Sequence, residues 1–309
     1  MTTPLLERLL NHKESANFIV IEDTILQSGY VLLKEFIKKV AKNQNRCVLL
    51  LCFEFSPEWF LENINSNKNL VIFDAYSKSD SYDFENDIIS DLNYNFIKNI
   101  KDTSEIINIL KDTIKKLSYS SYTLIIDSIS PLLLIDTSLT FNFLKRISSC
   151  LTLSVYHSDI PNYPSSGISG YLNVRNTLLH HIASTTIIIK NTEQFRKEST
   201  SHGYIITENN AIINAYMNFP ENSICIIEHR KKSGKVLYET NSYHIDESYG
   251  NMIIQLVKDV KEDLDPESNT PDPTTANLLF NLSLTESQKK AKNELVLPYV
   301  KIQGKIYIL

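Results

Sequence analysis

Six short runs of mostly apolar residues, separated by amphipathic stretches, constrain the fold of this chain more than any other feature of its sequence. Continuous apolar runs of this length are typical of strands that are buried on both faces of a sheet. They cover residues 18–21, 47–53, 70–73, 123–126, 151–156 and 185–189.

The stretches between these runs carry apolar residues at helical spacing. Leu33, Ile37 and Val40 lie on one helix face, and a second apolar stripe over residues 106–117 predicts a helix capped by Thr103. Alternation of strand and helix predicts an α/β domain with a mostly parallel sheet and right-handed crossovers.

Beyond residue 190 the apolar segments become shorter. Two of them, 223–229 and 236–243, flank a polar turn with one glycine, so we expect an antiparallel hairpin at the sheet edge. Two further short segments, 204–207 and 211–216, precede this hairpin. Helical spacing returns at 252–260, which predicts a helix there.

The composition of the chain divides it into three parts. Residues 1–261 form the expected α/β domain, and residues 262–276 are rich in acidic residues and proline, as solvated linkers are. Residues 277–309 contain an apolar peptide that is suited to docking on a partner. The expected docking residues are Phe280, Leu282, Leu297, Pro298 and Tyr299.

Charge and motif content exclude several classes of protein. The formal net charge of −5 provides no global attraction to nucleic acid or anionic lipid. The four cysteines form no disulfide framework, and no stretch has the length and apolarity of a membrane span, so we expect an intracellular protein. His180 and His181 are adjacent on a predicted helix and point apart, so we expect no metal site.

The junction after the first strand is where a nucleotide-binding fold places its phosphate loop. Besides the glycine just before its lysine, that loop needs another glycine five residues earlier, a lysine for the β- and γ-phosphates and a hydroxyl for magnesium. Aligned on Gly29, this chain has Thr24, Tyr30 and Val31 at those three positions. We therefore expect a degenerate nucleotide site, or an ordinary turn between strand and helix.

Two acidic positions lie at the ends of two predicted strands. Glu54 follows the second run, where RecA-like enzymes keep a water-activating glutamate, and Asp127–Ser128 ends the fourth run like a magnesium-coordinating strand. Each is also common at an ordinary strand end. Together with the junction at Gly29, their order resembles a RecA-like ATPase core without its phosphate site.

Two loops allow alternative interpretations. The hairpin turn concentrates four cations, Arg230, Lys231, Lys232 and Lys235. They suit contact with phosphate, either on RNA or on a nucleotide held by a neighbour. The alternative is an ordinary turn whose charges face solvent. The loop at 158–170 has four proline or glycine residues and no basic side chain. It either faces the pore of a RecA-like ring or is a surface connection.

Four segments together resemble the fungal family of Elongator complex subunit five, in the same order and over nearly the whole chain. They are Arg230-Lys231-Lys232-Ser233-Gly234-Lys235, Phe280-Asn281-Leu282, Gln288-Lys289-Lys290-Ala291-Lys292 and Val296-Leu297-Pro298. The chain lacks the long acidic extension that ends some fungal members.

The resemblance implies a RecA-like subunit without a phosphate loop, in a heterohexameric ring with Elongator subunits four and six. The ring associates with the catalytic Elongator subunits, binds tRNA, hydrolyses ATP and supports modification of the wobble uridine at carbon five. It implies no cofactor, no catalysis by this chain, and a cytoplasmic and nuclear location. The alternative is an independent nucleotide-dependent α/β enzyme that uses the cleft at Glu54 and Asp127.

Overall fold

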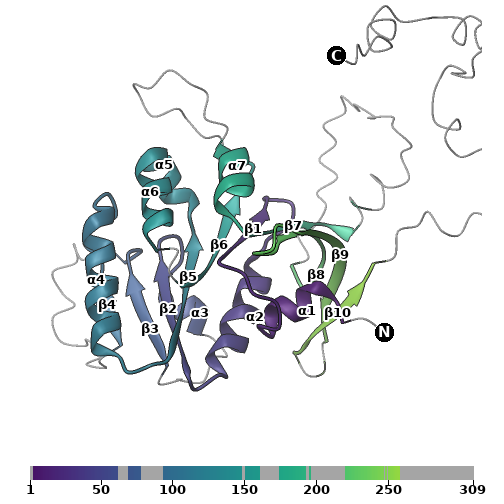
Figure 1. Ribbon diagram of the computed structural model, residues 1–309, viewed down its shortest axis with the longest axis horizontal. Helices are drawn as coiled ribbons and strands as arrows, with labels where there is room; N and C mark the ends of the chain where they lie inside the picture. The colour runs from purple at the N-terminus through teal and green to yellow at the C-terminus, as the bar shows by residue number, and fades with distance from the viewer. Residues whose placement is uncertain are drawn as a thin grey trace, which may run out of the picture. The chain divides into compact units, whose positions relative to one another are not determined.

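The computed structural model places the chain's described residues around one ten-stranded sheet (Figure 1). The strand order is β10-β9-β8-β7-β1-β6-β5-β2-β3-β4. The structure describes residues 3–61, 69–77, 93–147, 150–160, 174–192, 195, 220–246, 248 and 250–257.

All six predicted strands are present and pair in parallel with one another. A short strand that the sequence did not indicate, β4 (Tyr94–Phe96), adds to them in parallel beside β3. The six are β1 (Phe18–Asp23), β2 (Arg46–Cys52), β3 (Leu70–Asp74), β5 (Ser121–Ser128), β6 (Leu151–His157) and β7 (Thr185–Lys190).

Antiparallel strands form the other edge of the sheet. The predicted hairpin is confirmed as β8 (Asn222–Arg230) and β9 (Val236–Ile245). The predicted helix at 252–260 is wrong, because β10 (Met252–Leu256) pairs with β9. The apolar spacing there fits either a helix or a strand, and pairing with β9 provides partners for the backbone hydrogen-bonding groups of residues 252–256. The predicted segments 204–207 and 211–216 lie outside the described residues.

Both helices that were predicted from apolar stripes are present, as α2 (Tyr30–Ala41) and α4 (Thr103–Lys116). The N-cap of α4 is Asp102 and not Thr103, because the Asp102 carboxylate accepts hydrogen bonds from the backbone of Ser104 and Glu105. The remaining helices are α1 (Leu5–Leu10), α3 (Pro57–Leu61), α5 (Ser130–Ile135), α6 (Thr137–Ile147), α7 (Val174–Asn176) and the π-helix Thr177–Ile182.

Helices cover both faces of the parallel sheet, which makes two apolar cores (Figure 1). Helices α1, α2 and α3 pack on one face, and α4, α5, α6 and the π-helix pack on the other. In β1, Ile19 and Ile21 enter the first core while Phe18 and Val20 enter the second. This two-sided burial explains the continuous apolar runs and confirms the predicted α/β fold class.

Two findings concern the cysteines and the lengths of the helices. All four cysteines are free. Within the described ranges no helix combines the length and the apolarity that a membrane crossing requires.

Candidate functional site

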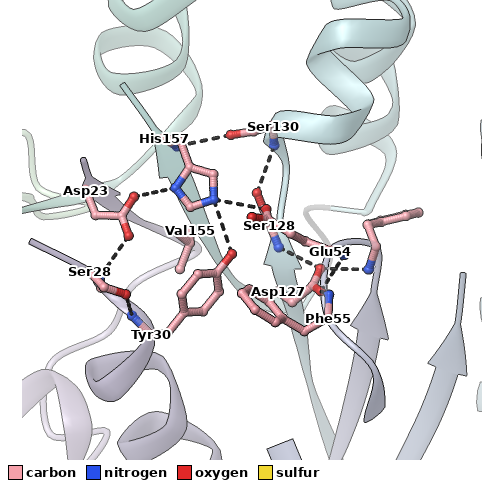
Figure 2. A network of polar contacts seen from close by, with 12 residues as sticks. Asp23, Ser28, Tyr30, Glu54, Phe55, Asp127, Ser128, Ser130, Val155 and His157 are labelled. Carbon is pink, nitrogen blue, oxygen red and sulfur yellow. Dashed lines mark hydrogen bonds and ion pairs between the residues drawn. The ribbon is translucent and has the colours of Figure 1, made fainter. Parts of the chain in front are cut away.

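The carboxyl ends of β1, β2, β5 and β6 bring four titratable side chains together (Figure 2). Asp23 ends β1, His157 ends β6, Asp127 lies near the end of β5, and Glu54 follows β2. This edge is where open α/β sheets bind ligands. The structure therefore gathers Glu54 and Asp127 at one place, together with Asp23 and His157.

His157 is held between two carboxylates. Its Nδ1 atom lies 2.5 Å from Oδ1 of Asp23, and its Nε2 atom lies 2.9 Å from Oε2 of Glu54 and 3.2 Å from the Tyr30 hydroxyl. Burial lowers the pKa of His157, but the hydrogen bonds and negative charges of Asp23 and Glu54 outweigh it and raise that pKa to about 10. The imidazole is therefore an internal cation at neutral pH.

The contact with His157 also shifts the pKa of Glu54, in the opposite direction. Burial raises its pKa, yet the hydrogen bond and charge of His157, with hydrogen bonds from Ser128 and Tyr30, bring the pKa below its ordinary value. Glu54 is thus an ionised carboxylate that is paired with His157.

The N-terminus of α2 already has an anion next to it. The backbone N–H of Gly29 donates to Oδ2 of Asp23 over 2.8 Å, at the place where a phosphate loop would bind phosphate. A Cβ atom on Gly29 would lie 2.6 Å from Cγ2 of Ile21, which explains why this position is glycine. The glycine thus serves close packing between α2 and β1.

Tyr30 occupies the space next to this helix end. It is 7% exposed, and its ring packs edge-on against Phe55 and Trp59, with centroids 4.7 and 5.6 Å away. Phe55 and Trp59 stack on each other at 4.7 Å, and Nζ of Lys34 lies 3.4 Å from the centroid of the Trp59 ring. An aromatic cluster therefore fills the position of the phosphate-loop lysine.

The other two positions of the degenerate loop have structural roles. Val31 is half-buried and packs on the first core, so its side chain belongs to the hydrophobic interior of the fold. Thr24 begins a turn in which its backbone pairs with that of Gln27. Neither residue supplies a hydroxyl in the position that magnesium coordination by a phosphate loop needs.

Asp127 is fully buried and its oxygens are occupied by backbone amides (Figure 2). Oδ1 accepts from Phe53 and Ser128 over 2.8 and 2.7 Å, and Oδ2 accepts from Glu54 and Phe55 over 2.8 and 2.9 Å. Burial raises the pKa of Asp127 to about 6, although the four amides oppose this. Asp127 therefore fixes the loop that carries Glu54 and Phe55.

The basic turn at the end of β8 separates into paired and exposed cations. Arg230 pairs with Glu228 at 2.8 Å and also donates to the backbone carbonyls of Leu179 and His180. Lys231 pairs with Glu14 at 2.9 Å. Lys232 and Lys235 are exposed on the turn.

The remaining expectations concern metal ligands, the loop at 158–170 and the C-terminal tail. No group of three potential metal ligands occurs among the residues that the structure describes. Residues 161–170 of the predicted pore loop and all five predicted docking residues of the tail lie outside the described residues.

Sequence reasoning missed His157, Asp23 and the aromatic cluster. The signal for the two charged residues was their position, because each ends a predicted apolar strand and parallel neighbouring strands end at the same edge. The signal for the cluster was weaker, since Phe55 and Trp59 lie in a loop and a five-residue helix.

Comparison with known proteins connects the chain to one family. It is similar to Elongator complex protein 5 of Saccharomyces cerevisiae (strain ATCC 204508 / S288c), with 23% identity over 313 residues, 97% of this chain and 88% of that protein.

Two solved structures are also similar. One, titled "The Structure Of A DnaB-Like Replicative Helicase And Its Interactions With Primase", has a TM-score of 0.44, 15% identity, and coverage of 77% of this chain and 57% of that one. The other is the structure of an ATPase domain, with a TM-score of 0.45, 17% identity, and coverage of 77% of this chain and 84% of that one.

The family model described as Elongator subunit Iki1 matches residues 5–307, nearly the whole chain. This match confirms the resemblance to Elongator subunit five that the sequence segments indicated. The chain belongs to the Elongator subunit Iki1 family.

Proposed function

We propose that this chain is a non-catalytic structural subunit of the Elongator complex that supports modification of the tRNA wobble uridine at carbon five. In this proposal it forms a RecA-like heterohexameric ring with Elongator subunits four and six, which binds tRNA and works with the catalytic subunits in the cytoplasm and nucleus. Family membership over residues 5–307 supports the Elongator assignment.

The observation that carries the non-catalytic part is the hydrogen bond from Gly29 to Asp23. The helix end that would attract phosphate is neutralised by the chain's own carboxylate, and Tyr30 fills the adjoining space. A nucleoside triphosphate placed there would meet two carboxylates, Asp23 and Glu54, and no lysine at position 30. This arrangement disfavours both binding and hydrolysis.

The alternative of an independent nucleotide-dependent enzyme has less support from the same geometry. The carboxylate of Asp127 accepts four backbone hydrogen bonds, so it has little capacity left to bind a metal ion. Oε2 of Glu54 is paired with His157, and the lowered pKa of this carboxylate makes it a weaker base for activating water.

We further propose that the basic turn contacts phosphate, either on tRNA or on a nucleotide held by a neighbouring subunit. Lys232 and Lys235 are the suited side chains because they are exposed. Arg230 and Lys231 are engaged within the chain, and would have to exchange Glu228 and Glu14 for such a ligand. Docking of Phe280, Leu282, Leu297, Pro298 and Tyr299 on a partner remains part of the proposal.

The test is reconstitution of the ring with Elongator subunits four and six, with and without this chain. We expect joint assembly, no ATP binding by this chain, and unchanged ATP turnover when Glu54→Gln is introduced, because glutamine still accepts a hydrogen bond from His157. Cells that lack the chain should lose the wobble modification, and both wild type and Glu54→Gln should restore it. Loss of ring ATP turnover in a fully assembled Glu54→Gln ring would contradict the non-catalytic role.

A further inference from the structure

The turn between β1 and α2 exposes two consecutive apolar side chains. Ile25 is 82% exposed, the highest value for a large apolar residue among those described, and Leu26 is 39% exposed. We call Ile25 and Leu26 the apolar tip. Turn residues facing water are ordinarily Gly, Pro, Asn, Asp or Ser, so this composition is unusual for a solvated turn.

The backbone of this turn is closed by hydrogen bonds on both sides of the apolar tip. Thr24 N donates to Gln27 O over 3.3 Å, and Gln27 N donates to Thr24 O over 3.0 Å. The backbone N–H of Ile25 also donates to Oδ2 of Asp159 over 2.7 Å. Three hydrogen bonds within four residues hold the backbone that carries Ile25.

Gln27 anchors the turn to the sheet. It is 1% exposed, and its Nε2 atom donates to Oγ of Ser223 on β8 over 2.7 Å. Its Oε1 atom accepts from Nδ2 of Asn191, just after β7, over 3.2 Å. The chain thus buries an amide side chain, with both of its polar atoms bonded, at the base of an exposed apolar tip.

Scattered single apolar residues on a surface need no explanation, but these two are consecutive on a turn whose backbone is held by hydrogen bonds. A side chain on a fixed turn loses little conformational entropy when a partner covers it, so pre-organisation favours binding. Ile25 keeps 82% of its surface exposed, so burial of its side chain adds little to the stability of the part of the chain that the structure describes. The arrangement therefore indicates an interface.

The chemistry around the apolar tip specifies the occupant. Ile25 and Leu26 have no polar side-chain atoms, and the carboxylate of Asp159 is exposed beside them, which disfavours a phosphate ligand. We propose that the apolar tip inserts into an apolar pocket with a basic rim on another Elongator subunit. This inference rests on the proposed function, because it requires that the chain is assembled with other subunits.

The experiment compares Ile25→Asp with Leu139→Asp in purified rings reconstituted from the full chain and its partner subunits. Leu139 is 45% exposed in the first turn of α6, where aspartate is favourable, so it is a matched control. We expect Ile25→Asp to weaken binding to the partner by roughly 10- to 100-fold, as loss of one buried aliphatic side chain predicts, and Leu139→Asp to leave it unchanged. Circular dichroism of the variants checks that both retain the fold.

A photo-crosslinking amino acid at position 25 identifies the occupant directly. Crosslinks to apolar residues of another Elongator subunit support the inference. Crosslinks to a second copy of this chain or to its own residues overturn it, as does wild-type affinity of Ile25→Asp. Failure of the wild-type chain to assemble at all would instead contradict the proposed function, so the two failures are distinguishable.

Discussion

Nδ1 of His157 and Oδ1 of Asp23 lie 2.5 Å apart, although the two residues are 134 positions apart in the chain. They are register partners at the ends of the parallel strands β6 and β1. With Glu54 on the other imidazole nitrogen, the pair makes an internal salt bridge at the edge where a ligand would otherwise bind. Its energetics can be measured through pH.

The stability provided by His157 should decrease at alkaline pH. Its pKa is about 10 in the folded chain and near 6.5 in an unfolded one, so the folded state binds more protons between these values. The contribution is complete below about pH 6.5 and is lost as pH rises through 10. His157→Gln should reduce the free energy of unfolding by about 3 kcal/mol at pH 6.5 and by less at pH 9.5.

Urea unfolding of wild type and His157→Gln across this range measures that difference. His181→Gln is the matched control, because it removes an exposed imidazole from the π-helix. If the difference in free energy of unfolding between wild type and His157→Gln is the same at all pH values, the ion pair does not account for the stability that His157 provides.

Restoring the missing residues of the phosphate loop should not restore nucleotide binding. Tyr30→Lys with Val31→Ser supplies the lysine and hydroxyl, but the Asp23 carboxylate still occupies the end of α2. Loss of the Tyr30 ring from its contacts with Phe55 and Trp59 should cost about 3 kcal/mol of stability. Calorimetric titration with ATP and magnesium checks the binding, and saturable binding by the double variant would refute the prediction.

Asp127→Asn should destabilise the chain rather than impair chemistry. One amide oxygen can serve at most two of the four backbone N–H groups that now donate to Asp127, so buried donors lose their acceptors. We expect a loss of about 3 kcal/mol in thermal or urea unfolding. Asp102→Asn is the control and should cost less than about 0.5 kcal/mol, because asparagine is an equally good N-cap. Unchanged stability of Asp127→Asn would contradict the structural role.

The cations of the basic turn should divide into two groups. Arg230→Ala should lower stability by about 2 kcal/mol, since the guanidinium joins Glu228 to the carbonyls at the end of the π-helix. Lys232→Ala should leave stability unchanged and, in the assembled ring, weaken tRNA binding for all sequences and reduce its salt slope by about 1. If Lys232→Ala lowers only ATP turnover, the turn contacts a nucleotide of the neighbouring subunit.

Sequence patterns predicted the parallel half of the sheet because its strands are buried on both faces and leave continuous apolar runs. The same logic failed for β10, where Met252 and Ile254 face the core while Ile253 is exposed. That spacing fits a helix or a strand, and only the neighbouring β9 decides between them. The short strand β4 has no burial pattern of its own and depends on β3.

The sequence predicted which residues of a nucleotide site are missing better than it predicted which contacts the residues present make. The lack of lysine at Tyr30 and of a hydroxyl at Val31 is visible in the sequence, and it predicted a degenerate loop. That Asp23 accepts from Gly29, or that Arg230 is paired with Glu228, depends on the side-chain geometry of residues only six and two positions apart, which residue spacing does not specify. Patterns along one chain do not contain that information.

The central position of β1 affects how the chain folds during its synthesis. Phe18 pairs with Thr152 and Ile19 with Thr185, so β1 leaves the ribosome well before its two neighbours, β6 and then β7. At typical elongation rates this interval lasts on the order of 10 s. Throughout it, a largely apolar strand stays unpaired, as is typical of the high contact order that slows folding and favours aggregation. We therefore expect ribosome-associated chaperones to raise the yield of folded chain during synthesis.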